Sequence, residues 1–281
     1  MSNKFEGIYQ ARDIYKDVND LYEGKTHKQY NIGYSNLNPL FKIVKPMFVV
    51  ITGTPNSGKS SFTYDIAMNL AKQHKFKFVI FSPEHSLAIN LKRLIEKYVK
   101  KPFDIFFENR LSRQEMVDAL KFIQEHFFFI DKRSESPDIS WILEKSQICI
   151  NEFSIDSLII DPFNEINPSR QSFSETEHIS VLISDIKRFN RENNTFTFMI
   201  AHPNKQIRDA QSGMFEVKSL YEISGSSHFN NKADVGMIVT RDYEKEETKI
   251  RIAKVRELDL MGNIGECKVK WNNDTRCFDE I

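Results

Sequence analysis

The sequence contains few cysteines and lacks long apolar runs. Only three cysteines occur among 281 residues, Cys149, Cys267 and Cys277, and they show neither CxxC spacing nor a Cys/His ligand pattern. This pattern argues against a disulfide framework and a zinc site. No stretch approaches the roughly 18 apolar residues of a membrane span, and the start of the chain, MSNKFEGIYQARD, lacks the apolar core of a signal peptide. We therefore expect a cytoplasmic protein with free thiols and no membrane contact.

The sequence also lacks an excess of charge of one sign. Lys plus Arg and Asp plus Glu both total 39, so the formal charge is zero and no global basic field would attract a nucleic acid. A polyanionic partner must therefore be held locally or by assembly of several copies. Hydrophobic residues make up 40% and charged residues 28%, an ordinary globular mixture that excludes a disordered chain.

We expect two unequal parts, an amphipathic arm with its linker over residues 1–30 and one large domain over residues 31–281. In residues 5–24 apolar side chains recur at roughly helical spacing among charges, and the polar stretch 24–31 follows. These apolar residues are Phe5, Ile8, Ile14, Val18 and Leu21. Such a stripe needs a covering surface but does not identify it. Packing on its own domain and docking on a partner both remain open.

From residue 46 onward, short apolar runs alternate with longer helical stretches, which is typical of a mostly parallel sheet covered by helices. The apolar runs occupy residues 47–52, 76–82, 127–130, 157–161 and 196–201. After residue 233, strand follows strand, over residues 235–241, 249–255 and 265–271. We therefore predict an α/β fold whose mostly parallel sheet ends in antiparallel C-terminal strands.

The strongest chemical signal is GTPNSGKS, a complete GxxxxGK[ST] motif between the apolar strand FVVIT and the helical run SSFTYDIAMNLA. Its glycines let backbone amides approach phosphate oxygens, and the helix N-terminus supplies positive potential. Lys59 is expected to bind the β and γ phosphates of ATP, and Ser60 to bind Mg²⁺. The predicted nucleotide-binding residues are Gly53, Thr54, Pro55, Asn56, Ser57, Gly58, Lys59, Ser60 and Ser61.

Three polar residues follow apolar strands whose carboxyl ends would meet at the P-loop edge of a parallel sheet. Asp161 ends SLIID and suits a metal-orienting carboxylate, although a strand-terminal Asp can also cap a turn. Glu84 ends FVIFSPE and could polarise an attacking water, or it could only cap the helix that starts near residue 86. His202 ends FMIAH and could donate a hydrogen bond to a phosphate, or it could serve the fold alone.

Two further cations, Lys254 and Arg256, end the strand TKIRIAKVR. The two-residue repeat of a strand turns both side chains to the same side. Two cations aimed in one direction suit a polyphosphate, whereas the alternative is an exposed strand end with solvated charges. From the spacing alone both interpretations remain open.

Taken in order, these segments resemble the RecA-type helicase domain of the DnaB family, and most closely its Twinkle branch and the helicase halves of phage primase-helicases. The matching segments are GTPNSGKS, FSPE, LIIDPFN, IAHPNK, ISGSSHFNNKADVGMIVTR, and KVR with the GNIG turn. Six ordered segments are far more specific than one P-loop. The resemblance implies a RecA-like ATPase core with ATP and Mg²⁺ as cofactors.

The resemblance also implies roles for the candidate residues. Glu84 would be the catalytic base, Asp161 would orient the metal ion, and His202 would sense the γ-phosphate. Lys254 and Arg256 would reach the ATP of a neighbouring subunit as piston and arginine finger.

By the same resemblance, residues 205–226 would face a central channel that holds single-stranded DNA. The predicted DNA-binding residues are Lys205, Arg208, Ser224, Gly225 and Ser226. Cations exceed carboxylates by only one between residues 202 and 232, but six copies around one strand would multiply that charge. The DnaB branch commonly carries an Arg-Glu pair before this Ser-Gly, whereas Glu222 and Ile223 stand here. The resemblance therefore does not imply that the side chains of Glu222 and Ile223 contact DNA.

We therefore expect a hexameric, ATP-dependent ring helicase that acts in DNA replication and moves 5′ to 3′ on single-stranded DNA. A primase and a polymerase are its expected further partners, in the cytoplasm or in a host cytoplasm if a phage encodes it. Two alternatives remain, a RecA/RadA-like DNA-dependent ATPase and a non-unwinding subunit that uses ATP only to close a ring on DNA. No zinc ribbon or acidic primase motif precedes the domain, so we expect no primer synthesis by this chain.

Overall fold

The computed structural model describes residues 7–132, 137–168, 174–203, 207–208, 215–223 and 227–281. Among these residues no helix is both long enough and apolar enough to cross a membrane. The predicted DNA-binding residues Lys205, Ser224, Gly225 and Ser226 lie outside the described residues. Arg208 lies in a two-residue strand, and its side chain is outside the description as well.

In the described part of the chain, nine strands form one sheet in the order β13-β12-β11-β10-β3-β7-β6-β4-β5. The strands from β10 to β5 run parallel, and β11, β12 and β13 continue the sheet antiparallel. The bounds are β3 Met47–Gly53, β4 Phe78–Phe81, β5 Phe127–Ile130, β6 Ser157–Ile160, β7 Phe196–Ile200, β10 Val235–Asp242, β11 Glu247–Val255, β12 Gly265–Asn272 and β13 Cys277–Glu280. The predicted α/β class with antiparallel C-terminal strands is confirmed.

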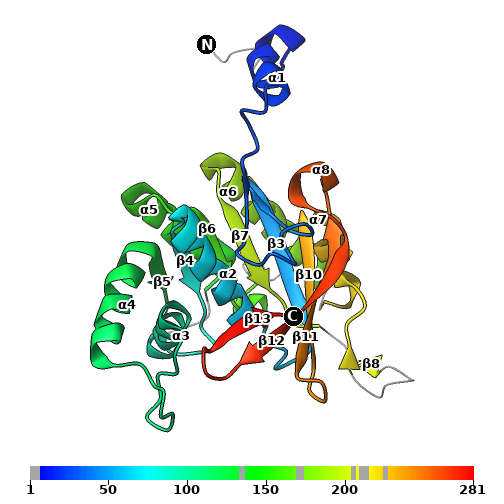
Figure 1. The fold of residues 1–281 in the computed structure, drawn as a ribbon. Helices are drawn as coiled ribbons and strands as arrows, with labels where there is room; N and C mark the ends of the chain where they lie inside the picture. The colour runs from blue at the N-terminus through cyan, green and yellow to red at the C-terminus, as the bar shows by residue number, and fades with distance from the viewer. Residues whose placement is uncertain (1–6, 133–136, 169–173, 204–206, 209–214, 224–226) are drawn as a thin grey trace.

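Helices cover both faces of this sheet (Figure 1). Buried residues of α2, α3 and α4 share one apolar cluster with one face of the strands, and those of α5, α6 and α7 share a second cluster with the other face. The helices are α1 Tyr15–Tyr22, α2 Lys59–His74, α3 Leu87–Val99, α4 Arg113–His126, α5 Ile139–Phe153, α6 Glu175–Asn193, α7 Ser227–Lys232 and α8 Leu258–Met261. Short 3₁₀ turns are η1 Ala11–Asp13, η2 Phe163–Glu165 and η3 Leu220–Glu222.

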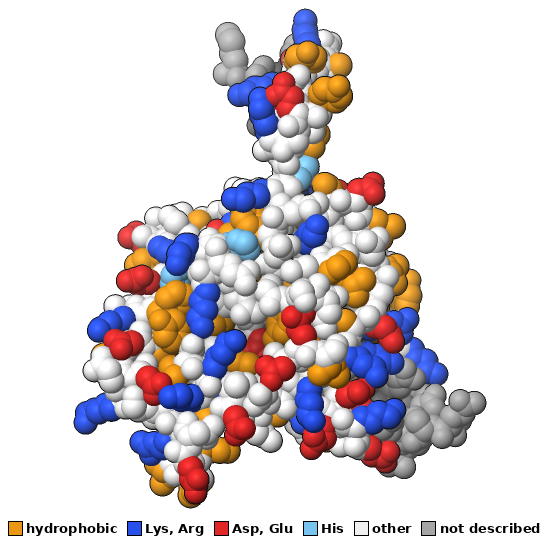
Figure 2. All heavy atoms as spheres, in the orientation of Figure 1, with side chains coloured by type: hydrophobic (Ala, Val, Ile, Leu, Met, Phe, Trp, Pro, Cys, Tyr) orange, Lys and Arg blue, Asp and Glu red, His pale blue; other side chains and the backbone are white. Residues whose placement is uncertain are grey.

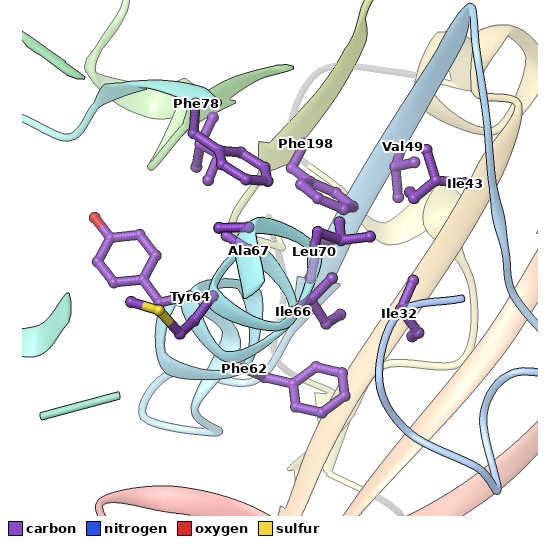
Figure 3. Packing of buried hydrophobic residues seen from close by; sticks show 14 of the residues in the cluster. Ile32, Ile43, Val49, Phe62, Tyr64, Ile66, Ala67, Leu70, Phe78 and Phe198 are labelled. Carbon is purple, nitrogen blue, oxygen red and sulfur yellow. The ribbon is translucent and has the colours of Figure 1, made fainter. Parts of the chain in front are cut away.

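The helix that follows the P-loop is buried in the first cluster. Figure 3 shows Ala67 and Leu70 of α2 beside Phe78, Phe198 and Val49 of the sheet, and the side chains of all five are fully buried. Because this face of α2 is covered by strands β3, β4 and β7, the N-terminus of the helix is held rigidly at the sheet edge. That edge carries the candidate site.

Each of the eight strands predicted from apolar runs is present within two residues of its expected bounds. The sequence pattern missed β13, which pairs with β12. The first two of its four residues are buried and the last two are exposed. The alternation of buried and exposed residues that would identify a strand is therefore absent. Two-residue ribbons were also missed, β1 Gln29–Tyr30 with β2 Ile43–Val44 and β8 Ile207–Arg208 with β9 Phe215–Glu216.

The N-terminal arm projects away from the sheet (Figures 1 and 2). Helix α1 follows the 3₁₀ turn η1, and the described apolar side chains of the arm are exposed. These residues are Ile8, Tyr9, Ile14, Tyr15, Val18, Leu21 and Tyr22. The position of the boundary at residue 30 stays a prediction.

Candidate functional site

The P-loop connects the buried strand β3 to helix α2, and two of its glycines are required by geometry. At Gly53, a Cβ atom would lie 1.9 Å from the carbonyl oxygen of Val239 on strand β10. Gly58 adopts φ 92° at the N-cap of α2, a left-handed conformation that favours glycine. The loop therefore presents its backbone and the helix N-terminus at the carboxyl edge of the sheet, where an anion is stabilised.

Lys59 is the first residue of α2 and is buried. Its Nζ donates hydrogen bonds to the carbonyl oxygens of Gly53 at 3.0 Å and Thr54 at 2.8 Å. Burial lowers the pKa of Lys59 to about 8, against the opposing effect of the nearby carboxylates Asp161 and Glu84. The ammonium group therefore stays charged at neutral pH and lies inside the P-loop.

The next residue joins the P-loop to strand β6. The Oγ of Ser60 donates to Oδ1 of Asp161, which stands directly after β6, at 3.0 Å. Burial raises the pKa of Asp161 to about 6, and the hydrogen bond from Ser60 opposes that shift. A hydroxyl and a carboxylate at this distance are the hard oxygen donors that Mg²⁺ prefers, so these residues fit the predicted metal. Within the described residues no group of three or more His, Cys, Asp or Glu could hold a metal ion.

A cavity of about 540 Å³ opens over the P-loop. Predicted residues beyond the ends of β3, β4 and β7 line it, and Asp161 beyond β6 bonds to the lining residue Ser60, because these four strands are neighbours in the sheet. Its lining includes Pro55, Asn56, Gly58, Lys59, Ser60 and Ser61 of the P-loop together with Glu84 and His202. The volume and polar lining suit a nucleotide.

Glu84 and His202 differ in their surroundings. Glu84 is exposed, three residues beyond β4. His202 is half-buried two residues after β7, and its backbone N donates to Oδ1 of Asn164 at 3.1 Å. Burial, with the charge of Lys59 as the next cause, lowers the pKa of His202. The neutral ring that this shift favours can donate one hydrogen bond and accept another.

Helix α3 contributes cavity residues that the sequence patterns did not indicate, among them Arg93 and Lys97. Nη2 of Arg93 lies 2.8 Å from Nε2 of His85. Nζ of Lys97 donates to Oγ of Ser61 at 2.8 Å and forms a buried ion pair with Asp65 at 3.0 Å. The four-residue spacing of Arg93 and Lys97 places both on one helix face, but the spacing alone does not show whether that face meets solvent or a ligand.

The hairpin of β12 and β13 contributes two further cavity residues, Trp271 and Arg276. Nζ of Lys97 lies 4.6 Å from the centroid of the Trp271 indole ring, and the Arg276 guanidinium carbon lies 5.3 Å from it. These residues are far from the P-loop in sequence and the second strand of the hairpin has no alternating pattern. Spacing alone could not have placed them here.

Lys254 and Arg256 do not line this cavity. Strand β11 is antiparallel to β10, and Val255 lies opposite Val235, which in turn pairs with Val49 near the start of β3. The two cations therefore lie at the end of the sheet opposite the P-loop, which is carried by the other end of β3. From there they can act on a nucleotide only if it belongs to another copy of the chain.

Glu84→Gln should keep ATP binding and lower ATP turnover by at least about a hundredfold, because it keeps the shape of the side chain and removes a base that can accept a proton from water. The measurement is steady-state ATP hydrolysis beside binding of a fluorescent nucleotide. Glu108→Gln, which changes a glutamate that does not line the cavity, is the control. Normal turnover of the Glu84 variant would remove Glu84 from the reaction. The alternative role as a helix cap is already excluded, because the N-cap of α3 is Ser86, whose Oγ accepts from the Ile89 N.

Comparisons with known proteins agree with this geometry. The chain matches the family described as the DnaB-like helicase C terminal domain over residues 31–280. It is 32% identical over 288 aligned residues to a protein named Twinkle homolog, chloroplastic/mitochondrial, from Arabidopsis thaliana, with 98% of this chain and 40% of that protein covered. A probable replicative DNA helicase of Trieres chinensis is 23% identical, with 99% of this chain and 64% of that protein covered. The chain thus spans less than two thirds of the length of each.

Two solved structures share the fold. One is described as an ATPase domain, with a TM-score of 0.79, 19% sequence identity, and 95% of this chain and 98% of that chain covered. The other is a DnaB-like replicative helicase described with its interactions with primase, with a TM-score of 0.75, 19% identity, and 97% and 67% covered. These similarities confirm the predicted RecA-like fold class and the predicted resemblance.

Proposed function

Because the chain belongs to the DnaB-like helicase C-terminal domain family, we propose that it is the ATP-hydrolysing motor of a replicative DNA helicase. The observation that carries the proposal is the meeting of Lys59, Ser60, Asp161, Glu84 and His202 at one edge of the sheet. Lys59, Ser60, Glu84 and His202 line one cavity, and Asp161 is joined to it through the hydrogen bond from Ser60. Side chains of these types at one site support phosphoryl transfer to water.

The roles follow from the contacts. Lys59, now bonded to the loop carbonyls, would bind the β and γ phosphates, and the backbone amides of the P-loop would hold the same oxygens. Ser60 and Asp161 would hold Mg²⁺, which when bound neutralises charge on the phosphates. Glu84 would accept a proton from the attacking water, and His202 would donate a hydrogen bond to the γ-phosphate.

A ring of six copies on single-stranded DNA is the assembly that we propose for this motor. It is supported by the position of Lys254 and Arg256 at the sheet end opposite the cavity, where they can serve only a neighbour. Helix α7 begins at Ser227, directly after the predicted DNA-binding residues Ser224, Gly225 and Ser226. The 5′ to 3′ direction and partnership with a primase and a polymerase belong to the same proposal, and the description of one structural neighbour names interactions with primase.

A forked DNA duplex tests the function directly. With ATP and Mg²⁺, the wild-type chain should separate the strands, and placing the single-stranded loading tail on either strand reports the direction. ATP hydrolysis with DNA coating or strand pairing but no separation would favour the RecA/RadA-like alternative. DNA binding that depends on ATP but proceeds without DNA-stimulated hydrolysis would favour the ATP-gated subunit.

Removal of residues 1–30 should weaken assembly, because the apolar residues of α1 are exposed on the single chain and would be covered by a second copy. We expect the truncated chain to shift from rings toward smaller species in light scattering at equal protein concentration, with its domain still folded. A fully assembled truncated chain would mean that the arm does not hold neighbouring copies together.

A further inference from the structure

The two cations at the far end of the sheet are held by an organised set of contacts. Nη2 of Arg256 donates to the carbonyl oxygens of Asn231 at 3.0 Å, Lys232 at 3.0 Å and Ala233 at 3.2 Å. Nζ of Lys254 donates to the carbonyl oxygen of Asn230. These carbonyls belong to the C-terminal end of helix α7 and the residue that follows it, where backbone acceptors lack partners and the helix dipole favours a cation.

Asp234 is the carboxylate at the centre of this set, and its side chain is only 9% exposed. Its Oδ1 accepts from Nε of Arg256 at 2.7 Å and from Nζ of Lys187 at 2.5 Å, and its Oδ2 accepts from the backbone N of Phe48 at 2.9 Å. Its backbone oxygen also accepts from the Arg256 N at 2.8 Å. The carboxylate is therefore fixed to the start of β3 and fixes the guanidinium in turn.

Lys187 and Arg256 both pair with the Asp234 carboxylate, and the charge of Asp234 also acts on the nearby Lys254. Burial, followed by the charge of Arg256, lowers the pKa of Lys254 to about 8. The three cations Lys187, Lys254 and Arg256 thus outnumber the one carboxylate, Asp234, that lies among them. Arg256 remains 41% exposed in its side chain, so the guanidinium can reach an anion outside its own chain.

Helix α7 also contacts the segment that follows Asp161 in its own subunit. Phe229, in the middle of α7, is fully buried and packs edge-to-face on Phe163, with ring centroids 5.2 Å apart. Phe163 stands two residues after Asp161, the proposed metal-binding carboxylate. One short helix therefore packs against the Asp161 segment and ends in the carbonyls that bind Arg256.

We propose that Asp234, together with the end of α7, positions Arg256 for the nucleotide of a neighbouring copy. This inference rests on the proposed function, because it needs ATP at the cavity and a neighbour within reach. Asp234 acts through Arg256 and does not touch the nucleotide.

Asp234→Asn tests the proposal, because it keeps the size of the side chain and removes the charge that orients Arg256. We expect DNA-stimulated kcat to fall about ten- to a hundredfold while the KM for ATP stays near its wild-type value, since misplacing a catalytic group costs rate and the P-loop is untouched. Asp185→Asn is the matched control, because Asp185 pairs with the exposed Arg188 at 2.9 Å on α6, outside the cluster.

Combined variants show whether Asp234 positions Arg256 or only stabilises the folded chain. Adding Asp234→Asn to Arg256→Ala should lower kcat no further than Arg256→Ala alone. Subunits with Asp234→Asn should regain turnover when mixed with Lys59→Ala subunits, which supply an intact Arg256, and should gain none from Arg256→Ala subunits. If Asp234→Asn does not fold, Asp234→Glu replaces it in every arm, because it keeps the charge and displaces the carboxylate by one methylene.

The outcomes distinguish this inference from the proposed function. A wild-type kcat in the folded Asp234 variant would overturn the positioning role of Asp234. The same holds if Asp234→Asn lowers kcat in the Arg256→Ala background by as much as it does alone. If mixtures of Arg256→Ala and Lys59→Ala recover no turnover although the subunits co-assemble, the shared site itself fails. Recovery in that mixture with no effect of Asp234→Asn rejects only the present inference.

Discussion

Lys59→Ala should lower ATP turnover by about a thousandfold or more and leave the fold intact. The ammonium group is the one P-loop side chain that carries positive charge into the cavity, and preorganised charge of this kind acts most strongly in a buried site. Its hydrogen bonds are made to the Gly53 and Thr54 carbonyls of the loop. Phosphate-release kinetics measure the loss, and circular dichroism checks the fold.

Lys72→Ala provides the matched control for this prediction. Lys72 lies on the same helix, and its Nζ donates to the carbonyl oxygen of Tyr98 at 2.9 Å, outside the cavity. Turnover of that variant should stay close to wild type. Unchanged turnover of the Lys59 variant would remove the P-loop from the proposed reaction.

Arg256→Ala should bind nucleotide nearly normally and hydrolyse it about a thousandfold more slowly, because an arginine supplied from another chain stabilises the charge of the transition state. The P-loop lies at one end of β3 and Arg256 lies beside the other end, so the proposed reaction draws on two separated parts of the chain. Each part is therefore intact in one of two inactive variants, Arg256→Ala and Lys59→Ala.

Mixing these two variants measures whether the site is shared. Activity should return at interfaces that join an intact P-loop to an intact Arg256, in a proportion set by the mixing ratio. Arg251→Ala is the control, since Arg251 lies on the same strand and its Nη1 donates to the Lys218 carbonyl oxygen at 3.2 Å. Co-assembled mixtures that stay inactive would place the action of Arg256 within its own subunit.

The parallel part of the sheet could be predicted because its strands are buried on both faces. Segments such as Phe78–Phe81 read as continuous apolar runs, and polar residues mark where they end. The P-loop could be predicted because the loop needs glycine at positions 53 and 58. Both residues have positive φ angles, and a Cβ atom at Gly53 would collide with the backbone of Val239. The meeting of Glu84, Asp161 and His202 then follows from the common edge of parallel strands.

The remaining features depend on contacts between distant segments, which local patterns do not encode. Arg93 and Lys97 face the cavity because α3 packs beside α2, and the polar side of a helix reads alike whether it faces solvent or a ligand. The importance of Asp234 lies in its simultaneous contacts with β3, α6 and the end of β11. A single aspartate before a strand carries no such signal in the sequence.

The candidate nucleotide cavity is lined by side chains that are far apart along the chain, and this determines when its complete lining can form during synthesis. Its wall runs from the P-loop, which begins at Gly53, to Arg276 in the β12–β13 hairpin, 223 residues later. At about 5–20 residues per second, a ribosome needs roughly 10 to 45 s to make the intervening chain. During that interval the P-loop exists without the hairpin side of the cavity, so the complete set of contacts to a bound nucleotide forms only when the polypeptide is nearly finished.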